Sequence, residues 1–119
     1  MGRLTTHVLD TAQGRPAAGL EIELWRLDDS GERRVPLRIV QTNADGRTDG
    51  PLLEGETLAA GTYELVFAVG DFFARQPVMT GDPPFLGRVP VRFTVADPDA
   101  HYHVPLLVSP WAYSTYRGS

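Results

Sequence analysis

The residues best suited to chemistry gather in the last nineteen positions of the chain. Two of the three histidines, His101 and His103, occur there, together with Arg117 and several hydroxyl side chains. Histidine titrates nearest neutral pH, so it can take a proton from water and pass it on. A chain end is usually the least ordered part of a domain. This density of proton-handling groups therefore indicates a site.

Strand periodicity predicts which of these side chains share a face. Residues 101–108 alternate as a half-buried strand does. The face that points to the core carries Tyr102, Val104, Leu106 and Val108. The opposite face carries His101, His103, Pro105 and Leu107. In the expected strand 4–10, the same parity places His7 beside Thr5 and Leu9, opposite Val8.

An outer sheet face that mixes histidines with Pro105 and Leu107 is unusual for a monomer. A surface of such mixed character is typical of one that another subunit covers. In that arrangement His7, His103 and Tyr116 would line a cleft between copies of the chain.

Arg47 directly follows a turn and is the third candidate for a site residue, after His7 and His103. Residues 43–46 are strong turn formers, so the turn can direct the Arg47 side chain rigidly. The segment does not read as a calcium loop, because Gln41 stands at the first acidic position and Leu52 at the closing glutamate position.

A metal site is the first alternative for the histidines. His101 and His103 form a His-x-His pair, a weak zinc signal, and only His7 and carboxylates remain to complete the ligand set. We therefore predict no metal and no cofactor.

The elements that must position these residues are short strands. The 12 glycines and 10 prolines punctuate β-rich runs, a layout typical of an all-β sandwich. Further strands are expected at 20–27, 35–42, 63–69, 88–95 and 111–117. One short helix is expected after Asp71, which we assign as its N-cap. With no linker or repeat visible, residues 1–119 are expected to form a single domain.

Composition excludes several functions. The net charge of −4 and the lack of a basic run argue against nucleic acid and membrane-surface partners. With no cysteine, disulfides and thiolate chemistry are excluded. No apolar run is long enough to span a bilayer, and no signal-peptide layout is present, so a cytoplasmic location is expected.

Three separated motifs resemble one family. They are the opening Leu-Thr-Thr-His-Val-Leu-Asp-Thr at 4–11, the central Thr-Asn-Ala-Asp-Gly-Arg at 42–47, and the C-terminal signature at 101–110 with the closing Tyr-Arg-Gly-Ser at 116–119. Together they are similar to 5-hydroxyisourate hydrolases, which are related to transthyretin. The resemblance covers essentially the whole chain.

This resemblance implies a fold and an assembly. The implied fold is a transthyretin-like β-sandwich of two four-stranded antiparallel sheets with one short helix. The implied assembly is a homotetramer, a dimer of dimers, with active sites in the channel between dimers.

The resemblance also implies an activity, the hydrolysis of 5-hydroxyisourate in urate degradation. The catalytic residues that it implies are His7, Arg47 and His103, with no cofactor. The substrate-binding residues that it implies are Tyr116, Arg117, Gly118 and Ser119. One histidine would deprotonate the attacking water while the other orients it or protonates the leaving nitrogen. The alternative is a transthyretin-like carrier of small ligands without catalysis.

Overall fold

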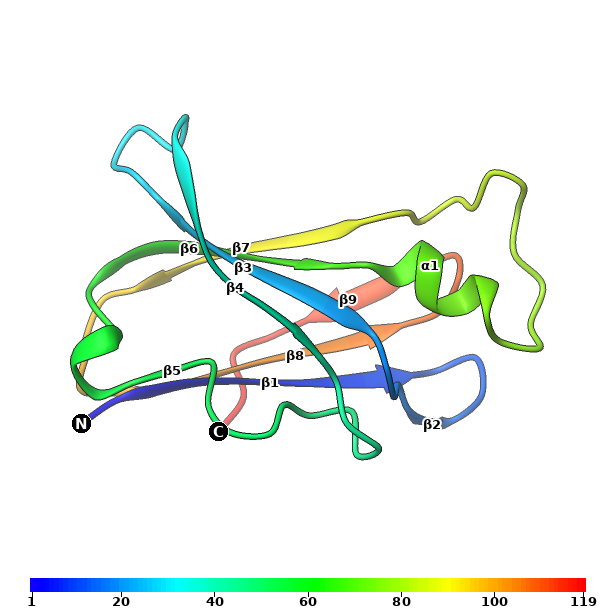
Figure 1. Cartoon of the computed structure of the whole chain (residues 1–119), viewed down its shortest axis with the longest axis horizontal. Coiled ribbons are helices and arrows are strands. Elements are labelled where there is room, and N and C mark those ends of the chain that lie inside the picture. Colours follow the sequence, from blue (N-terminus) through cyan, green and yellow to red (C-terminus); the bar gives the residue numbers. More distant parts are fainter.

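Alternating apolar side chains build two sheets that pack face to face, as the computed structural model of residues 1–119 shows (Figure 1). The first sheet has the strand order β2-β1-β8-β9, and β5 pairs with the beginning of β1. Its strands are β1 (Arg3–Asp10), β2 (Arg15–Pro16), β5 (Leu53–Glu54), β8 (His101–Val108) and β9 (Tyr113–Thr115).

The second sheet has the order β4-β3-β6-β7 and is antiparallel throughout. Its strands are β3 (Glu21–Leu27), β4 (Arg34–Gln41), β6 (Gly61–Phe67) and β7 (Val89–Val95). A 3-10 turn, η1 (Gly55–Thr57), and one helix, α1 (Val69–Ala74), complete the chain. None of these helical segments is long and apolar enough to cross a membrane.

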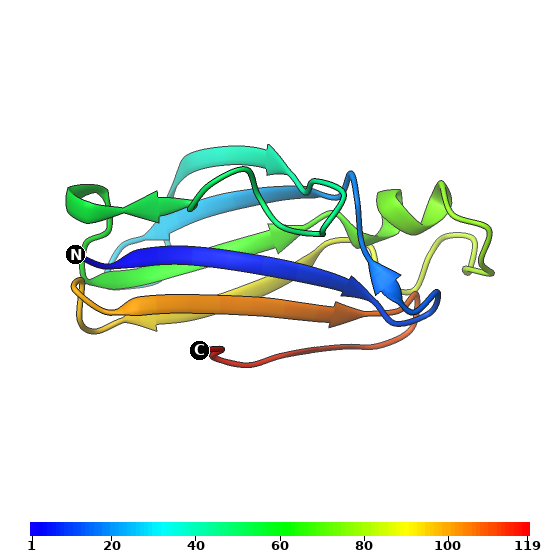
Figure 2. The same cartoon turned by 90° about the horizontal axis from the view of Figure 1, so that it is seen from below.

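The expected sandwich with one short helix is confirmed. The second sheet has the expected four antiparallel strands, whereas the first sheet has β5 as a fifth strand and one parallel pair. Strands β1 and β8 run in the same direction and pair from Arg3 with His101 to Asp10 with Val108. In Figure 2 these two strands lie side by side with their arrowheads at the same end. Two strands from opposite ends of the chain thus become neighbours in the middle of one sheet.

The core forms from the residues that parity assigns to the inner faces. Fully or nearly fully buried side chains include Leu4, Val8, Leu20, Ile22, Leu24, Tyr63, Leu65, Phe67, Val89, Val95, Tyr102, Leu106 and Val108. Because each strand alternates, burial of these residues leaves the partly exposed Thr5, His7 and His103 on the other side of the first sheet.

The expected N-cap of the helix is wrong. Helix α1 begins at Val69, with Ala68 at the N-cap position and no side-chain cap, and Asp71 lies inside the first turn. Burial of Val69, Phe72 and Phe73 decides where this turn forms, because packing outweighs a capping bond of about 1 kcal/mol. The last strand is also shorter than expected, since only Tyr113–Thr115 pair continuously with β8.

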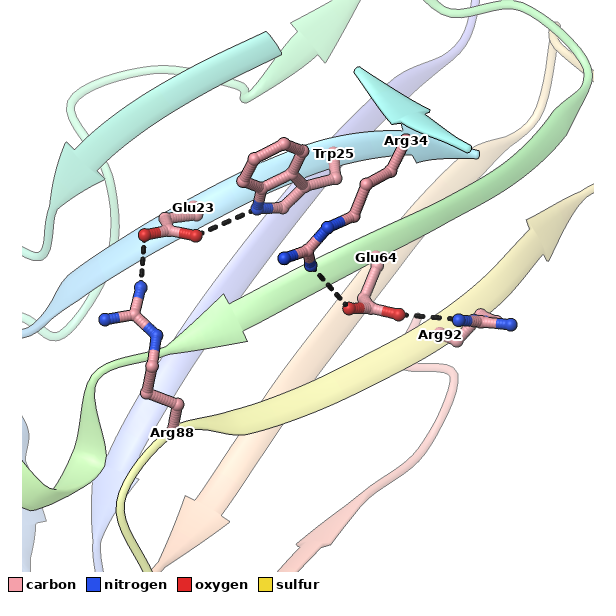
Figure 3. Close-up of polar contacts among 6 residues, drawn as sticks. All are labelled: Glu23, Trp25, Arg34, Glu64, Arg88 and Arg92. Atoms are coloured by element: carbon pink, nitrogen blue, oxygen red, sulfur yellow. Dashed lines mark hydrogen bonds and ion pairs between the residues drawn. The ribbon is translucent and has the colours of Figure 1, made fainter. Parts of the chain in front are cut away.

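A network of charges covers the outer face of the second sheet (Figure 3). The buried Glu64 carboxylate accepts from Arg34 at 3.4 Å and from Arg92 at 3.2 Å. Next to it, the Trp25 indole N–H donates to Glu23, which also pairs with Arg88. The Trp25 hydrogen bond, with Arg88, holds the pKa of Glu23 below its usual range, although burial opposes this. The carboxylates of Glu23 and Glu64 are therefore each paired with at least one arginine.

Replacing Glu64 with glutamine should destabilise the fold, because two arginines would then face each other without a carboxylate. The arginine side chains are half exposed, so we expect the free energy of unfolding to fall by only about 1–2 kcal/mol. Urea unfolding of Glu64→Gln measures the loss, and Glu32→Gln in an exposed turn is the control. Equal stability of the two variants would contradict this account of the network.

Candidate active site

Four separated parts of the chain meet on the outer face of the first sheet. Arg47 forms an isolated antiparallel bridge with His7 of β1. Thr5 of β1 is the register partner of His103 in β8, and His103 in turn bridges to Gly118. In Figure 2 β1, β8 and the C-terminal segment lie side by side. The pairing of adjacent backbones therefore brings Arg47 and the two histidines together.

The turn before Arg47 is held against β1. The Asn43 side-chain oxygen accepts from the backbone N–H groups of Asp45 at 2.9 Å and Arg47 at 3.1 Å. Gly46 has a φ of 74°, and its carbonyl accepts from Val8 N–H at 2.8 Å. A Cβ at Gly46 would collide with the Val8 carbonyl oxygen, so only glycine permits this close approach.

The His7 ring is anchored by this turn. Its Nε2 lies 2.8 Å from the carbonyl oxygen of Asp45. A carbonyl oxygen can only accept, so Nε2 must carry the hydrogen and donate it. In the neutral ring the remaining lone pair is then on Nδ1.

The His103 ring is confined on two sides. Its Nδ1 lies 2.8 Å from the Thr5 hydroxyl. The Gly118 N–H donates to the His103 carbonyl at 2.7 Å, and a Cβ on Gly118 would lie only 2.6 Å from His103 Cδ2. The absence of a side chain at 118 therefore lets the terminal segment lie directly against the imidazole.

The environment of His103 favours its neutral form. Partial burial lowers the pKa of His103, and the positive charges of Arg47 and His7 lower it further. A histidine with a lowered pKa is unprotonated at neutral pH, which is the state a general base needs.

A cleft of about 650 Å³ opens beside these residues. Its walls are Arg3, Thr5, Thr6, Arg47, Thr48, Gly50, Pro51, His101, His103 and Ser119. None of these is a large apolar residue, and none has a carboxylate side chain. The lining is therefore cationic and rich in hydrogen-bonding groups, so it suits a small polar or anionic ring better than an apolar ligand.

The expected site residues do not all lie in one cleft. Arg47, His103 and Ser119 line this cleft, whereas His7 lies at its side, in register with Arg47. Tyr116 and Arg117 instead line a second cleft of about 340 Å³ between β7 and the terminal segment. There the Arg117 guanidinium lies 4.3 Å from the centre of the Tyr102 ring. No group of three or more His, Cys, Asp or Glu residues is arranged to hold a metal ion.

Reasoning from the sequence missed Arg3, Thr48 and the role of Thr5. Parity places Thr5 on the face of His7, but only the parallel register with β8 places it opposite His103. Arg3 enters the cleft through the same register, beside His101.

Comparison with known proteins shows which chains this one resembles. A protein of Rhizobium meliloti (strain 1021) named 5-hydroxyisourate hydrolase 2 is 64% identical over 99% of this chain and 97% of its own. The solved 5-hydroxyisourate hydrolase of Klebsiella pneumoniae is 34% identical over the full length of both chains, with a TM-score of 0.80. Transthyretin from Sparus aurata, at 24% identity, shares the fold with a TM-score of 0.85 over 98% of this chain and 96% of its own.

The model of the HIUase/Transthyretin family matches residues 4–118, which include the opening and central motifs and all of the C-terminal motif except Ser119. This match spans nearly the whole sandwich, including every strand that contributes to the cleft. The chain therefore belongs to the HIUase/Transthyretin family.

Proposed function

We propose that the chain, as one transthyretin-like domain, hydrolyses 5-hydroxyisourate to 2-oxo-4-hydroxy-4-carboxy-5-ureidoimidazoline. Full-length relatives carry the name of this hydrolase. The observation on which the proposal rests most is that the His103 imidazole and Arg47 line the same cleft, where burial and the charge of Arg47 lower the pKa of His103. This arrangement supplies a base and a cation where an amide carbonyl can bind.

In the proposed reaction His103 is the general base. Its ring removes a proton from a water molecule as the water oxygen attacks the ring amide carbonyl. The carbon–nitrogen bond of the amide then breaks and the leaving nitrogen takes up a proton. The former carbonyl group, with the oxygen of the attacking water, becomes a carboxylate group. His103 suits this role because its lowered pKa leaves the ring unprotonated at neutral pH.

Arg47 holds the substrate oxygens and stabilises the oxyanion that forms on attack. Its guanidinium is always charged and offers several donors in one plane. The hydrogen bonds of the turn hold the Arg47 backbone against β1, so the side chain extends toward the cleft from a fixed position.

The remaining family-implied residues have supporting roles in this proposal. His7 orients the water or returns the proton to the leaving nitrogen. Ser119 hydrogen-bonds the ring in the cleft, and Gly118 allows the terminal segment to approach His103. Tyr116 and Arg117 shape the substrate pocket when further copies of the chain complete it.

The carrier alternative has less support. A carrier of small apolar ligands needs apolar walls, and this cleft has arginines, histidines and threonines instead. The relatives named as hydrolases at 51% identity or more also favour the enzyme.

The proposal includes a homotetramer, a dimer of dimers, with the clefts between dimers. The cleft is open in the single chain, and the exposed Tyr113 and Tyr116 of the C-terminal segment leave large aromatic surface for a partner to cover. The cytoplasmic location expected from the sequence stays a prediction.

The activity is tested by the ultraviolet decay of 5-hydroxyisourate generated freshly from urate. The chain should accelerate the decay, and His103→Ala should lower kcat by roughly 10²- to 10⁴-fold through loss of the base. Arg47→Ala should lower it by roughly 10²- to 10³-fold. Arg15→Ala, at an exposed arginine outside the cleft, is the control. Wild-type decay at the spontaneous rate would refute the function.

The pH dependence tests the role of His103. Since its pKa is lowered, kcat/KM should stay constant near neutral pH and fall only below about pH 6.5, where free histidine titrates. Arg47→Gln removes a positive charge that opposes protonation, so the pKa should rise and the acid limb of the residual activity should move to higher pH. The other basic side chains of the cleft, Arg3 and His101, and the neighbouring His7 remain in this variant. An acid limb unmoved by Arg47→Gln would argue against His103 as the base.

The assembly is tested by dilution. If the site is completed between dimers, specific activity should fall as sedimentation velocity shows the tetramer dissociating. Constant activity per chain in isolated dimers would contradict this placement.

A further inference from the structure

Thr5 contacts the imidazole that the proposed reaction uses. It is the direct register partner of His103 across the parallel β1–β8 pair, and both side chains point to the outer face. The Thr5 Oγ1 atom lies 2.8 Å from His103 Nδ1. Thr5 also lines the cleft.

The neighbouring Thr6 shows that this contact is not a generic property of strand threonines. Thr6 faces the core, and its hydroxyl donates to the Val104 carbonyl at 2.7 Å. That bond joins β1 to the backbone of β8, whereas the Thr5 hydroxyl bonds a titrating ring. The two adjacent residues therefore have separable roles, one in strand pairing and one at the ring.

A neutral imidazole carries one hydrogen, and a hydroxyl group can either accept from Nδ1–H or donate to a bare Nδ1, so this contact allows two tautomers with different chemistry. If Nδ1–H donates to Thr5 Oγ1, the lone pair is on Nε2, which is then free to accept a proton from water. If the hydrogen were on Nε2, that nitrogen would be a donor and could not act as a base.

We propose that Thr5 is a positioning residue that accepts a hydrogen bond from His103 Nδ1 and so holds the ring with Nε2 as the catalytic base. This inference rests on the proposed hydrolysis. Gly118 completes the arrangement, because the absence of a side chain there lets the terminal segment lie against the Cδ2 edge of the ring. The ring plane and the tautomer are then both determined by neighbouring residues, as in the histidines of other active sites whose second nitrogen is hydrogen-bonded.

Thr5→Val tests this with little change of shape. A methyl group would replace the hydroxyl, and an Nδ1–H without an acceptor is unfavourable in a partly buried position, so the hydrogen should move to Nε2. We expect kcat to fall roughly ten- to a hundredfold with little change in KM, as for other residues that orient a functional histidine. Thr5→Ser keeps the hydroxyl and should restore most of kcat.

The control is Thr62→Val, at a half-buried threonine of β6 in the other sheet, which should keep wild-type kcat. A general effect of valine on strand packing would appear in both valine variants. Failure of Thr5→Ser to restore activity, or equal kcat for Thr5→Val and the wild type, would overturn the positioning role.

Nitrogen-15 NMR of the histidine rings tests the tautomer without relying on activity. The wild-type spectrum should show the hydrogen of His103 on Nδ1, and Thr5→Val should shift it to Nε2. A wild-type ring with its hydrogen on Nε2 would overturn the inference even if the chain is an active hydrolase. An inactive wild type with the hydrogen on Nδ1 would instead refute the hydrolysis and leave the Thr5 contact established.

Discussion

The parallel pairing of β1 with β8 is the constraint on which the candidate site depends. It joins the two ends of the chain in one continuous register, so Thr5 lies opposite His103 and Arg3 lies opposite His101. Side chains alternate between the two faces of a strand, so a slip of one residue would turn the whole histidine face into the core. Burial of Leu4, on the inner face of β1, makes such a slip costly. The hydrophobic core therefore maintains the geometry of the polar face.

The outer faces of the two sheets differ in how their charges are balanced. On the second sheet, the carboxylates of Glu23 and Glu64 pair with arginines (Figure 3). On the first sheet, the cleft has arginines and histidines and no carboxylate side chain. Burial lowers the pKa of His103, and the nearby charge of Arg47 lowers it further and attracts negative charge. Burial and charge together thus favour a neutral His103, and the same charge favours a developing oxyanion.

Two glycines show how the backbone serves the site. Gly46 lets the turn that carries Arg47 approach β1, and Gly118 lets the terminal segment approach the His103 ring. At both positions a Cβ would collide with atoms that hold or form the site. These two glycines matter because they have no side chain and so leave space for a close approach. The pattern of polar and apolar residues in the sequence does not predict such an approach.

Sequence patterns alone predicted the sandwich class, the inner and outer faces of the strands near 4–10, 20–27, 88–95 and 101–108, and the candidates His7, Arg47 and His103. These follow from local rules, because periodicity and turn chemistry act over a few residues and the family motifs are contiguous. Only the tertiary structure decided that β1 and β8 run parallel, that Thr5 contacts His103, that Ser119 lies in the cleft, and that Tyr116 lies outside it. The helix start was also decided there, since buried Phe72 and Phe73 outweighed the capping preference of Asp71. Pairing between strands that are distant in the sequence depends on how the whole core packs. The local spacing of residues therefore does not predict which of these strands pair.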